Sequence, residues 1–291
     1  MHKIKKATNV FEKIMNVAFI FCGFSAAVFV ILITGFLIAS GMPAINEIGI
    51  IDFMFGTEWA STAATPSYGI LPFILTSVYG CIGAIIIGVP LGLMCAIFIA
   101  KMANDKISNA VRSAVDLLSG IPSVVYGLIG MIIIVPIVRE VFNLPDGANL
   151  FSAIIVLTVM ILPSVISVSE TAIRAVPKEY EEASLALGAT KTETVFKVVV
   201  PAAKSGILTS VVLGIGRSIG EAMAVMMVSG NVANMPGLFK SVRFLTTAVA
   251  SEMSYSSGLQ RQALFSIALV LFVFIMIINI VLNLIVKKDK V

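Results

Sequence analysis

Histidine, cysteine and charged side chains are scarce in this 291-residue sequence. The one histidine is His2, and the three cysteines, Cys22, Cys81 and Cys95, each fall within an apolar run. This pattern excludes a Ser-His catalytic pair, a zinc-binding spacing and the disulfide framework of a secreted protein. The phosphate-binding sequence G-x-x-x-x-G-K-[ST] is also missing, so we expect no ATP hydrolysis by this chain. The sequence therefore predicts a protein that is not an enzyme and has no metal or cofactor of its own.

Apolar residues dominate the composition. The sequence is 58% hydrophobic and 12% charged, against about 45–50% apolar and about 25% charged residues in soluble domains. The basic residues flank apolar runs rather than forming a patch, which indicates a lipid bilayer and no nucleic acid. We therefore predict an all-α, polytopic membrane protein with six transmembrane helices in a single domain, 1–291. The expected spans are about 14–39, 69–100, 117–138, 150–169, 206–229 and 263–286.

The distribution of Lys and Arg predicts the orientation. Of the 20 basic residues, 15 lie in the N-terminal segment, residues 101–116, residues 173–204 and the C-terminal tail. Four lie in the remaining loops, and Arg217 lies within a span. Because cytoplasmic loops carry the excess of Lys and Arg, both termini and residues 173–204 are expected in the cytoplasm. An even number of spans agrees with this.

Residues 175–204 form the long polar segment of the chain. Pro177 is placed to begin a helix, and Gly188 is a natural helix end. Thr190 and Glu193 have the spacing of a capping box, which predicts a second helix. Helix signals alone are equally satisfied by an ordinary cytoplasmic helical hairpin.

The same segment resembles the EAA signature of ABC importer permeases, EAA-x3-G-x9-I-x-L-P. Its spacing is kept at Glu182, Ala183, Gly188, Val198, Val200 and Pro201. The third position of the signature holds Ser184 instead of alanine. The resemblance implies that residues 175–204 are a coupling loop that docks in a cleft of an ATPase subunit. The ATPase-coupling residues that it implies are Glu182, Ala183, Gly188 and Pro201.

Arg217 lies near the middle of the fifth apolar run. A central arginine costs about 2.5–3.5 kcal/mol on insertion scales, so its presence indicates a structural or functional role. Glu221 follows at i+4, which places both groups on one face of a continuous helix. Gly216 and Gly220 predict close packing against another helix. The pair is either a structural ion pair that fixes helix packing or a site on the path of a solute.

A guanidinium group offers paired donors to a tetrahedral oxyanion. Glu221 would repel a dianion unless it neutralises Arg217 in the empty path or accepts a hydrogen bond from a protonated oxyanion. Phosphate near neutral pH carries such a proton and sulfate does not. The pair Arg217 and Glu221 therefore favours phosphate, as a hypothesis.

Four stretches resemble the PstC-type permeases of phosphate importers, which are permeases of the type I ABC importer fold. They are GRSIGEAMAVMMVSGN (216–231), GIPSVVYGLIG (120–130), FGTEW with YGILP (55–59 and 68–72) and GVPLGLMCAIFIAKMA (88–103). PstA-type permeases share the arginine and glutamate but tend not to continue with this Met-Ala-Val run. The resemblance implies a multi-pass protein of a bacterial or archaeal plasma membrane. Implied partners are a PstA-type second permease, two PstB-type ATPase subunits and a phosphate-binding protein.

In this interpretation Arg217 and Glu221 are pore residues, and Ser123, Tyr126 and Ser164 are weaker candidates to line the substrate path, since polar residues at span bends often only stabilise packing. ATP is used by the partner subunits. Three alternatives remain open: a permease for sulfate or molybdate, a stand-alone channel or carrier, and an assembly scaffold without a path of its own.

Overall fold

The structure is a computed structural model that describes the backbone of residues 2–288, with the side chains of residues 12–281 and 284. The predicted all-α class is confirmed, apart from one short hairpin, β1 (Trp59–Ala60) and β2 (Ser67–Tyr68). The helices before the coupling loop are α1 (His2–Ile48), α2 (Ile50–Phe55), α3 (Leu71–Ile97), η1 (Phe98–Met102), α4 (Asp105–Gly120), α5 (Ser123–Ile129), η2 (Gly130–Ile134), α6 (Val135–Val141) and α7 (Leu150–Arg174). The later helices are α8 (Lys178–Ala186), α9 (Lys191–Thr194), η3 (Val195–Val199), α10 (Val200–Ala202), α11 (Lys204–Gly220), α12 (Met223–Val228), α13 (Leu245–Glu252) and α14 (Gly258–Lys288).

Five helices are long and apolar enough to cross a membrane, and a bent pair makes a sixth. The five are Glu12–Ile48, Leu71–Met102, Ser123–Val141, Leu150–Arg174 and Gly258–Val281. The bent pair joins Lys191–Ala202 to Lys204–Gly220 at an angle of 69°. This supports the predicted six-span architecture.

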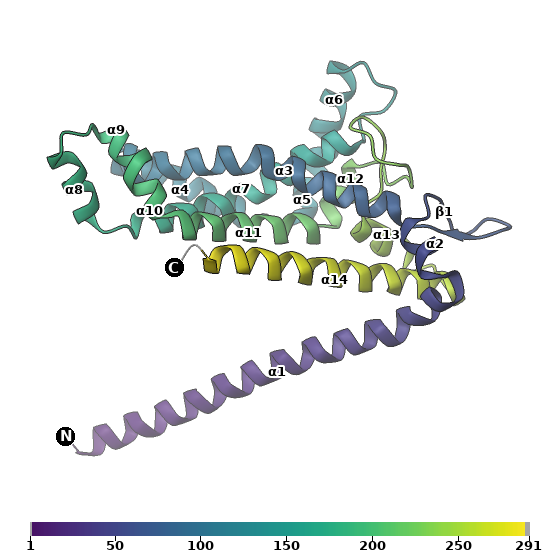
Figure 1. The fold of residues 1–291 in the computed structure, drawn as a ribbon, viewed down its shortest axis with the longest axis horizontal. Coiled ribbons are helices and arrows are strands. Elements are labelled where there is room, and N and C mark those ends of the chain that lie inside the picture. The colour runs from purple at the N-terminus through teal and green to yellow at the C-terminus, as the bar shows by residue number, and fades with distance from the viewer. Residues whose placement is uncertain (1, 289–291) are drawn as a thin grey trace.

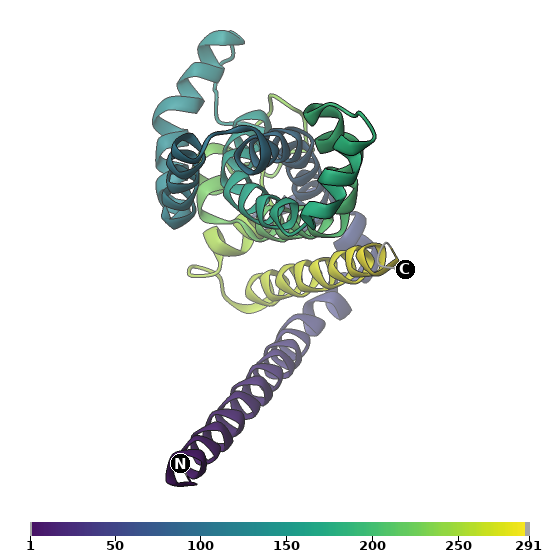
Figure 2. The same ribbon diagram turned by 90° about the vertical axis from the view of Figure 1, so that its left-hand side faces the viewer.

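Helices α3, α7 and α11 run side by side through the centre of the molecule, with α14 along one flank (Figure 1). Helix α1 diverges from this bundle and meets it near its C-terminal end (Figures 1 and 2). None of the most apolar stretch of α1 is buried within this chain. The bundle therefore leaves this stretch of α1 free to contact lipid or another protein.

Small residues bring α3 and α7 together. They recur every fourth position on one face of α3, at Gly80, Ala84, Gly88 and Gly92. A Cβ atom added at Gly88 would lie 2.7 Å from the side chain of Ile161 on α7. This is the small-residue packing by which membrane helices approach closely. The stripe makes α3 and α7 the rigid centre against which α11 is placed.

Helix α1 crosses α14 at Gly41. A Cβ atom added there would lie 2.9 Å from the backbone nitrogen of Ser266. The Ser266 hydroxyl donates a hydrogen bond of 2.6 Å to the carbonyl oxygen of Gly41. A side chain at position 41 would therefore force the two backbones apart.

Breaks between helices shift or interrupt two of the predicted spans. The stretch 101–116, expected as a charged loop, contains most of helix α4, which Asn104 caps by accepting a 2.9 Å hydrogen bond from the Ile107 N–H. Because α4 continues to Gly120, the span predicted at 117–138 instead covers Ser123–Val141. The span predicted at 206–229 is interrupted after Gly220.

The beginning of α1 and the end of α14 point toward the end of the molecule that carries α8 and α9 (Figure 1). The hairpin and α2 lie at the opposite end. Most lysines near the two termini lie outside the residues whose side chains are described. They are at positions 3, 5, 6, 287, 288 and 290. The cytoplasmic location of both termini stays a prediction.

We predict that Gly41→Ala destabilises the protein and that Gly35→Ala does not. Both changes add one methyl group to α1, where alanine is the better helix former by about 1 kcal/mol. Gly35 has open space around it, so only this gain applies there. At Gly41 the methyl group meets the backbone of α14, and we expect a loss of about 1–3 kcal/mol. Thermal unfolding in one detergent measures both, and equal stabilisation by the two changes would contradict the close crossing.

Candidate functional site

The first feature of the site is a break between α11 and α12. The backbone of Glu221 is extended, with φ −73° and ψ 131°, so α11 ends at Gly220. The Glu221 Oε1 atom accepts a 2.9 Å hydrogen bond from the N–H of Ala224 and so caps the first turn of α12. The Thr246 hydroxyl on α13 donates a 2.6 Å hydrogen bond to the Glu221 carbonyl oxygen. The prediction that Arg217 and Glu221 share a face of one continuous helix is therefore wrong.

A second break separates α4 from α5 at Ile121 and Pro122. The Tyr126 hydroxyl donates a 2.6 Å hydrogen bond back across it to the carbonyl oxygen of Leu118. Tyr126 is only 7% exposed, and this bond satisfies its hydroxyl. Tyr126 therefore stabilises the break between α4 and α5.

The segments that follow the two breaks pack together. A Cβ atom added at Gly127 on α5 would lie 2.8 Å from the Cα atom of Ala224 on α12. Irregular backbone at membrane depth survives only where it is shielded by protein or lines a wet cavity. The close contact of α5 with α12 thus gathers both irregular segments in one region of the bundle.

Arg217 lies on α11 one turn before the first break and is half-buried. Among the residues that the structure describes, it makes no ion pair and no hydrogen bond. Its positive charge lies within electrostatic reach of the Tyr126 hydroxyl at the second break. The structural ion pair with Glu221, one of the two alternatives, is therefore not formed, and no described residue supplies a counter-charge to the guanidinium.

The face of α11 that carries Arg217 is uncovered. Leu213 and Gly216 lie four residues and one residue before the arginine on this face, Gly220 lies three residues after it, and all three are exposed. A Cβ atom added at Gly216 or Gly220 would have no neighbour within 4 Å. The close helix packing predicted for these two glycines is therefore not made within the described part of this chain.

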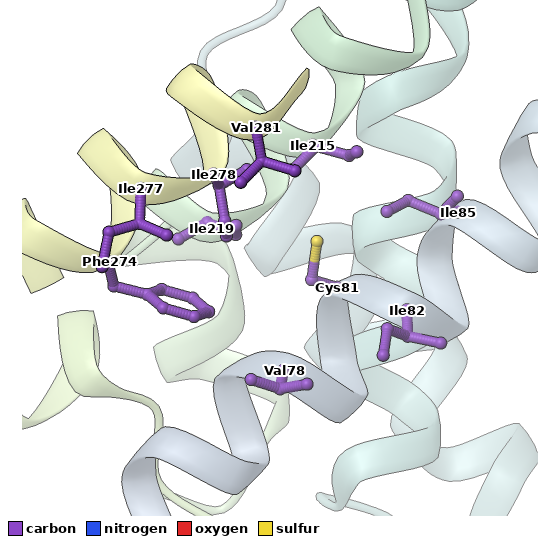
Figure 3. A pocket seen from close by; sticks show the side chains of 10 residues that line it. All are labelled: Val78, Cys81, Ile82, Ile85, Ile215, Ile219, Phe274, Ile277, Ile278 and Val281. Atoms are coloured by element: carbon purple, nitrogen blue, oxygen red, sulfur yellow. The ribbon is translucent and has the colours of Figure 1, made fainter. Parts of the chain in front are cut away.

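The opposite face of α11 lines an apolar cavity of about 290 Å³ between α3, α11 and α14 (Figure 3). Ile215 and Ile219 project into it from α11, and Cys81 from α3 supplies a thiol. Because helical residues two positions apart point in nearly opposite directions, Arg217 faces away from this cavity. The cavity therefore offers an oxyanion no strong donor.

The two serines predicted to line the path occupy different positions. Ser123 is the first residue of α5, directly after the second break, and is half-buried. Ser164 lies on α7, where its hydroxyl oxygen is buried and has no hydrogen-bond partner among the described residues. The structure joins neither hydroxyl to Arg217 by a described contact, and both assignments stay predictions.

The coupling loop folds as the helix signals predict. Gly188 has φ +88°, the left-handed conformation that glycine adopts readily, and it ends α8. Thr190 and Glu193 form the capping box of α9, with a 3.1 Å hydrogen bond from the Thr190 N–H to the Glu193 carboxylate. That bond, the Thr190 hydroxyl and Lys197 lower the pKa of Glu193 to about 2. The carboxylate is therefore ionised, and the cap complete, at neutral pH. Pro177 immediately precedes α8 rather than occupying its first position.

The signature residues lie on the outer surface of this loop. Glu182, Ala183, Gly188 and Pro201 are all exposed. Leu187 beside them is 89% exposed. An exposed polar helix end with an apolar tip is suited to docking in a protein cleft.

Two ionic contacts that the sequence did not predict lie where the loop meets the spans. Lys101, at the end of η1, forms an ion pair with Glu181 on α8. Buried Glu170 on α7 accepts hydrogen bonds from Arg112 on α4 and from Arg174. The available signals were a lone glutamate at the end of an apolar run and an arginine four residues later. The first contact joins α8 to the end of η1, and the second joins α4 to α7 where α7 leads into the loop.

Comparison with known proteins identifies the fold and the relatives. The profile of the family described as "Binding-protein-dependent transport system inner membrane component" matches residues 88–288. The chain is 39% identical over 258 residues to the probable ABC transporter permease protein YqgH of Bacillus subtilis, covering 86% of this chain and 84% of the relative. It is 34% identical over 242 residues to the phosphate transport system permease protein PstC of Pasteurella multocida, covering 76% and 75%. The PstC protein of Haemophilus influenzae is 33% identical over 258 residues, with 81% of each chain covered.

Solved structures agree on the fold. The inward-facing MetNI methionine ABC transporter superposes with a TM-score of 0.57 at 21% identity, covering 76% of this chain and 94% of the other. A bacterial alginate ABC importer superposes with a TM-score of 0.58 at 13% identity, covering 85% and 94%. The likeness confirms the predicted type I importer permease fold.

We predict that Glu221→Ala lowers stability and that Glu221→Gln does so much less. Alanine removes the oxygen that accepts from the Ala224 N–H, and loss of a helix cap costs about 0.5–2 kcal/mol. Glutamine keeps an acceptor oxygen and removes only the charge. The midpoint temperatures of unfolding in detergent test this, and equal losses in the two variants would show that the carboxylate does not act as a cap.

Proposed function

Since the chain belongs to the family of binding-protein-dependent transport system inner membrane components, we propose that it is the transmembrane permease subunit of an ATP-driven phosphate importer. The guanidinium of Arg217, which has no partner among the described residues and lies on the open face of α11, carries this proposal. Relatives called phosphate transport system permease protein PstC support the choice of phosphate. The chain itself is a transport subunit in a cell membrane, without enzymatic chemistry.

Arg217 is the residue that we assign to the anion. A guanidinium at membrane depth is costly unless a charge or a wet cavity compensates it. No carboxylate in the described part of this chain pairs with Arg217, so a passing anion can provide the compensating negative charge. Guanidinium binds oxyanions through paired, charge-assisted hydrogen bonds, and its positive charge is independent of pH in the physiological range.

Glu221 is the residue that we assign to discrimination between anions. Its Oε1 atom is committed to the N–H of Ala224. The second carboxylate oxygen has no partner among the described residues, and it is available as an acceptor. A protonated phosphate can donate to it, whereas sulfate has no proton to donate. Sulfate and molybdate permeases are the competing candidates, and competition by these anions distinguishes them.

The open face of α11 also calls for a second permease. A path needs walls on all sides, and here Gly216 and Gly220 leave one side of Arg217 uncovered. A second six-span chain, of PstA type, would close that side and complete the path. The unburied span of α1 offers further apolar surface for such an assembly.

The coupling loop connects the path to ATP hydrolysis. We assign α8 and the exposed residues Glu182, Ala183 and Gly188 to the contact with a cytoplasmic ATPase subunit of PstB type. Two such subunits would be present, one for each permease. The Lys101–Glu181 ion pair then transmits movement of α8 to the end of α3. In a stand-alone channel this loop would have no partner, so its presence favours an importer.

We predict that Arg217→Ala abolishes most phosphate uptake by the transporter reconstituted in lipid vesicles. Hydrogen bonds to charged groups contribute about 1.5–3 kcal/mol, which corresponds to a loss of about 10- to 150-fold. Arg217→Lys should retain part of the activity, since lysine keeps the charge but loses the paired donors. Arg139→Ala, which removes an exposed arginine on α6, is the control.

Uptake of radiolabelled phosphate with ATP inside the vesicles measures these rates, with co-purification of the ATPase subunits as the check on assembly. Wild-type phosphate uptake by an assembled Arg217→Ala transporter would refute the assignment. ATP-driven uptake of sulfate or molybdate, with phosphate ineffective as a competitor, would refute phosphate as the substrate.

A further inference from the structure

An acidic hollow lies at the end of the molecule opposite the coupling loop, where α1 meets α2 and the β-hairpin (Figure 1). Its volume is about 500 Å³. The side chains of Glu47, Asp52 and Glu58 line it. Residues 40–70, which supply almost the whole lining, contain no lysine, arginine or histidine. The hollow is therefore a concentration of negative charge on the face remote from the ATPase contact.

The three carboxylates differ from the nearby Glu252. Glu252 is paired with Arg243 and also accepts hydrogen bonds from Trp59 and Gln260. By contrast, none of the three carboxylates of the hollow has a basic or donor partner among the described residues. Among the described residues, Glu252 therefore has partners that compensate its charge, whereas the three carboxylates of the hollow have none.

Tyr68 gives independent evidence that the hollow receives a polar group. The residue is only 8% exposed and packs edge to face on Trp59, yet it lines the hollow. Its hydroxyl has no hydrogen-bond partner in the described part of the chain. Burial, and then the negative charge of Glu47, raise the pKa of Tyr68, so the phenol is protonated at neutral pH. Ser67 beside it also has a buried hydroxyl oxygen without a partner.

The hollow does not have the geometry of a metal site. Calcium takes six to eight oxygen ligands at about 2.3–2.6 Å. Among the described residues, no three acidic, histidine or cysteine side chains come close enough to hold a metal ion. The lining is also partly apolar, through Ile48, Pro66 and Leu259. Separated carboxylates beside apolar surface instead fit a long cationic side chain, whose stem packs while its head pairs.

We propose that this hollow receives a lysine or arginine side chain of the solute-binding protein, and that it anchors that protein on the outer face of the permease. The inference rests on the proposed function, because dependence on a binding protein is what makes such a partner available. The charge of the hollow and its position opposite the coupling loop select a soluble protein with a basic contact residue. Unlike charges also speed the encounter of two proteins.

The test measures docking of the solute-loaded binding protein to the complete transporter in lipid nanodiscs. Glu47→Gln combined with Glu58→Gln should raise the apparent Kd about tenfold, and the remaining affinity should depend less on salt. Tyr68→Phe should weaken docking about two- to fivefold while keeping the ring in place. Glu140→Gln, which removes an exposed carboxylate on α6, should change docking less than twofold. Glu58→Lys should be rescued by exchanging the partner's contact lysine for glutamate.

ATPase activity at saturating binding protein is the measure of correct folding, and we expect it to be unchanged in the Gln and Phe variants. Unchanged Kd values in both variants would overturn the role of the hollow while leaving the importer intact. Weakening of docking by EDTA, with no effect of the Gln variants on salt dependence, would indicate a bound cation and would also overturn it. A wild-type transporter that takes up no phosphate would instead refute the proposed function.

Discussion

The structure depends on a charge that the described part of the chain does not neutralise. Arg217 lies on a helix among membrane spans, half-buried, without an ion pair or hydrogen bond among the described residues. Such a group persists only if its surroundings are wet or a counter-charge arrives from outside. The neighbouring positions on that face are small or exposed, and the opposite face lines an apolar cavity (Figure 3). The helix therefore separates a polar side from a hydrophobic side.

The two helix breaks give this polar side its shape. An unbroken helix presents few free polar groups, whereas each break here exposes backbone that must be satisfied locally. Tyr126 and Glu221 both do so, the first by bonding Leu118 and the second by capping α12. Thr246 fixes the carbonyl group of Glu221, which links the first break to α13. Rigid breaks of this kind hold Arg217 in position, and they leave the open face of α11 to a partner chain.

The sequence predicted the all-α class, the number of spans and the two short helices of residues 175–204, because hydropathy and helix caps act locally. The capping box of Thr190 and the end of α8 at Gly188 needed no tertiary information. The prediction from sequence failed where tertiary contacts override the local preference of the chain. An i+4 spacing indicated one helix through Glu221, but the cap on Ala224 and the bond from Thr246 stabilise the break instead. The Lys101–Glu181 contact joins residues 80 positions apart, and no local pattern indicates it.

The exposure of the Arg217 face tests the account most directly. In a transporter whose native cysteines are replaced, Gly216→Cys places a thiol beside the arginine and Ile215→Cys places one toward the apolar cavity. We predict that a membrane-impermeant, charged thiol reagent modifies the first variant, that phosphate slows this reaction, and that the second variant stays unmodified. Modification of the Ile215→Cys variant alone, or no effect of phosphate on the Gly216→Cys variant, would contradict a solute path along Arg217.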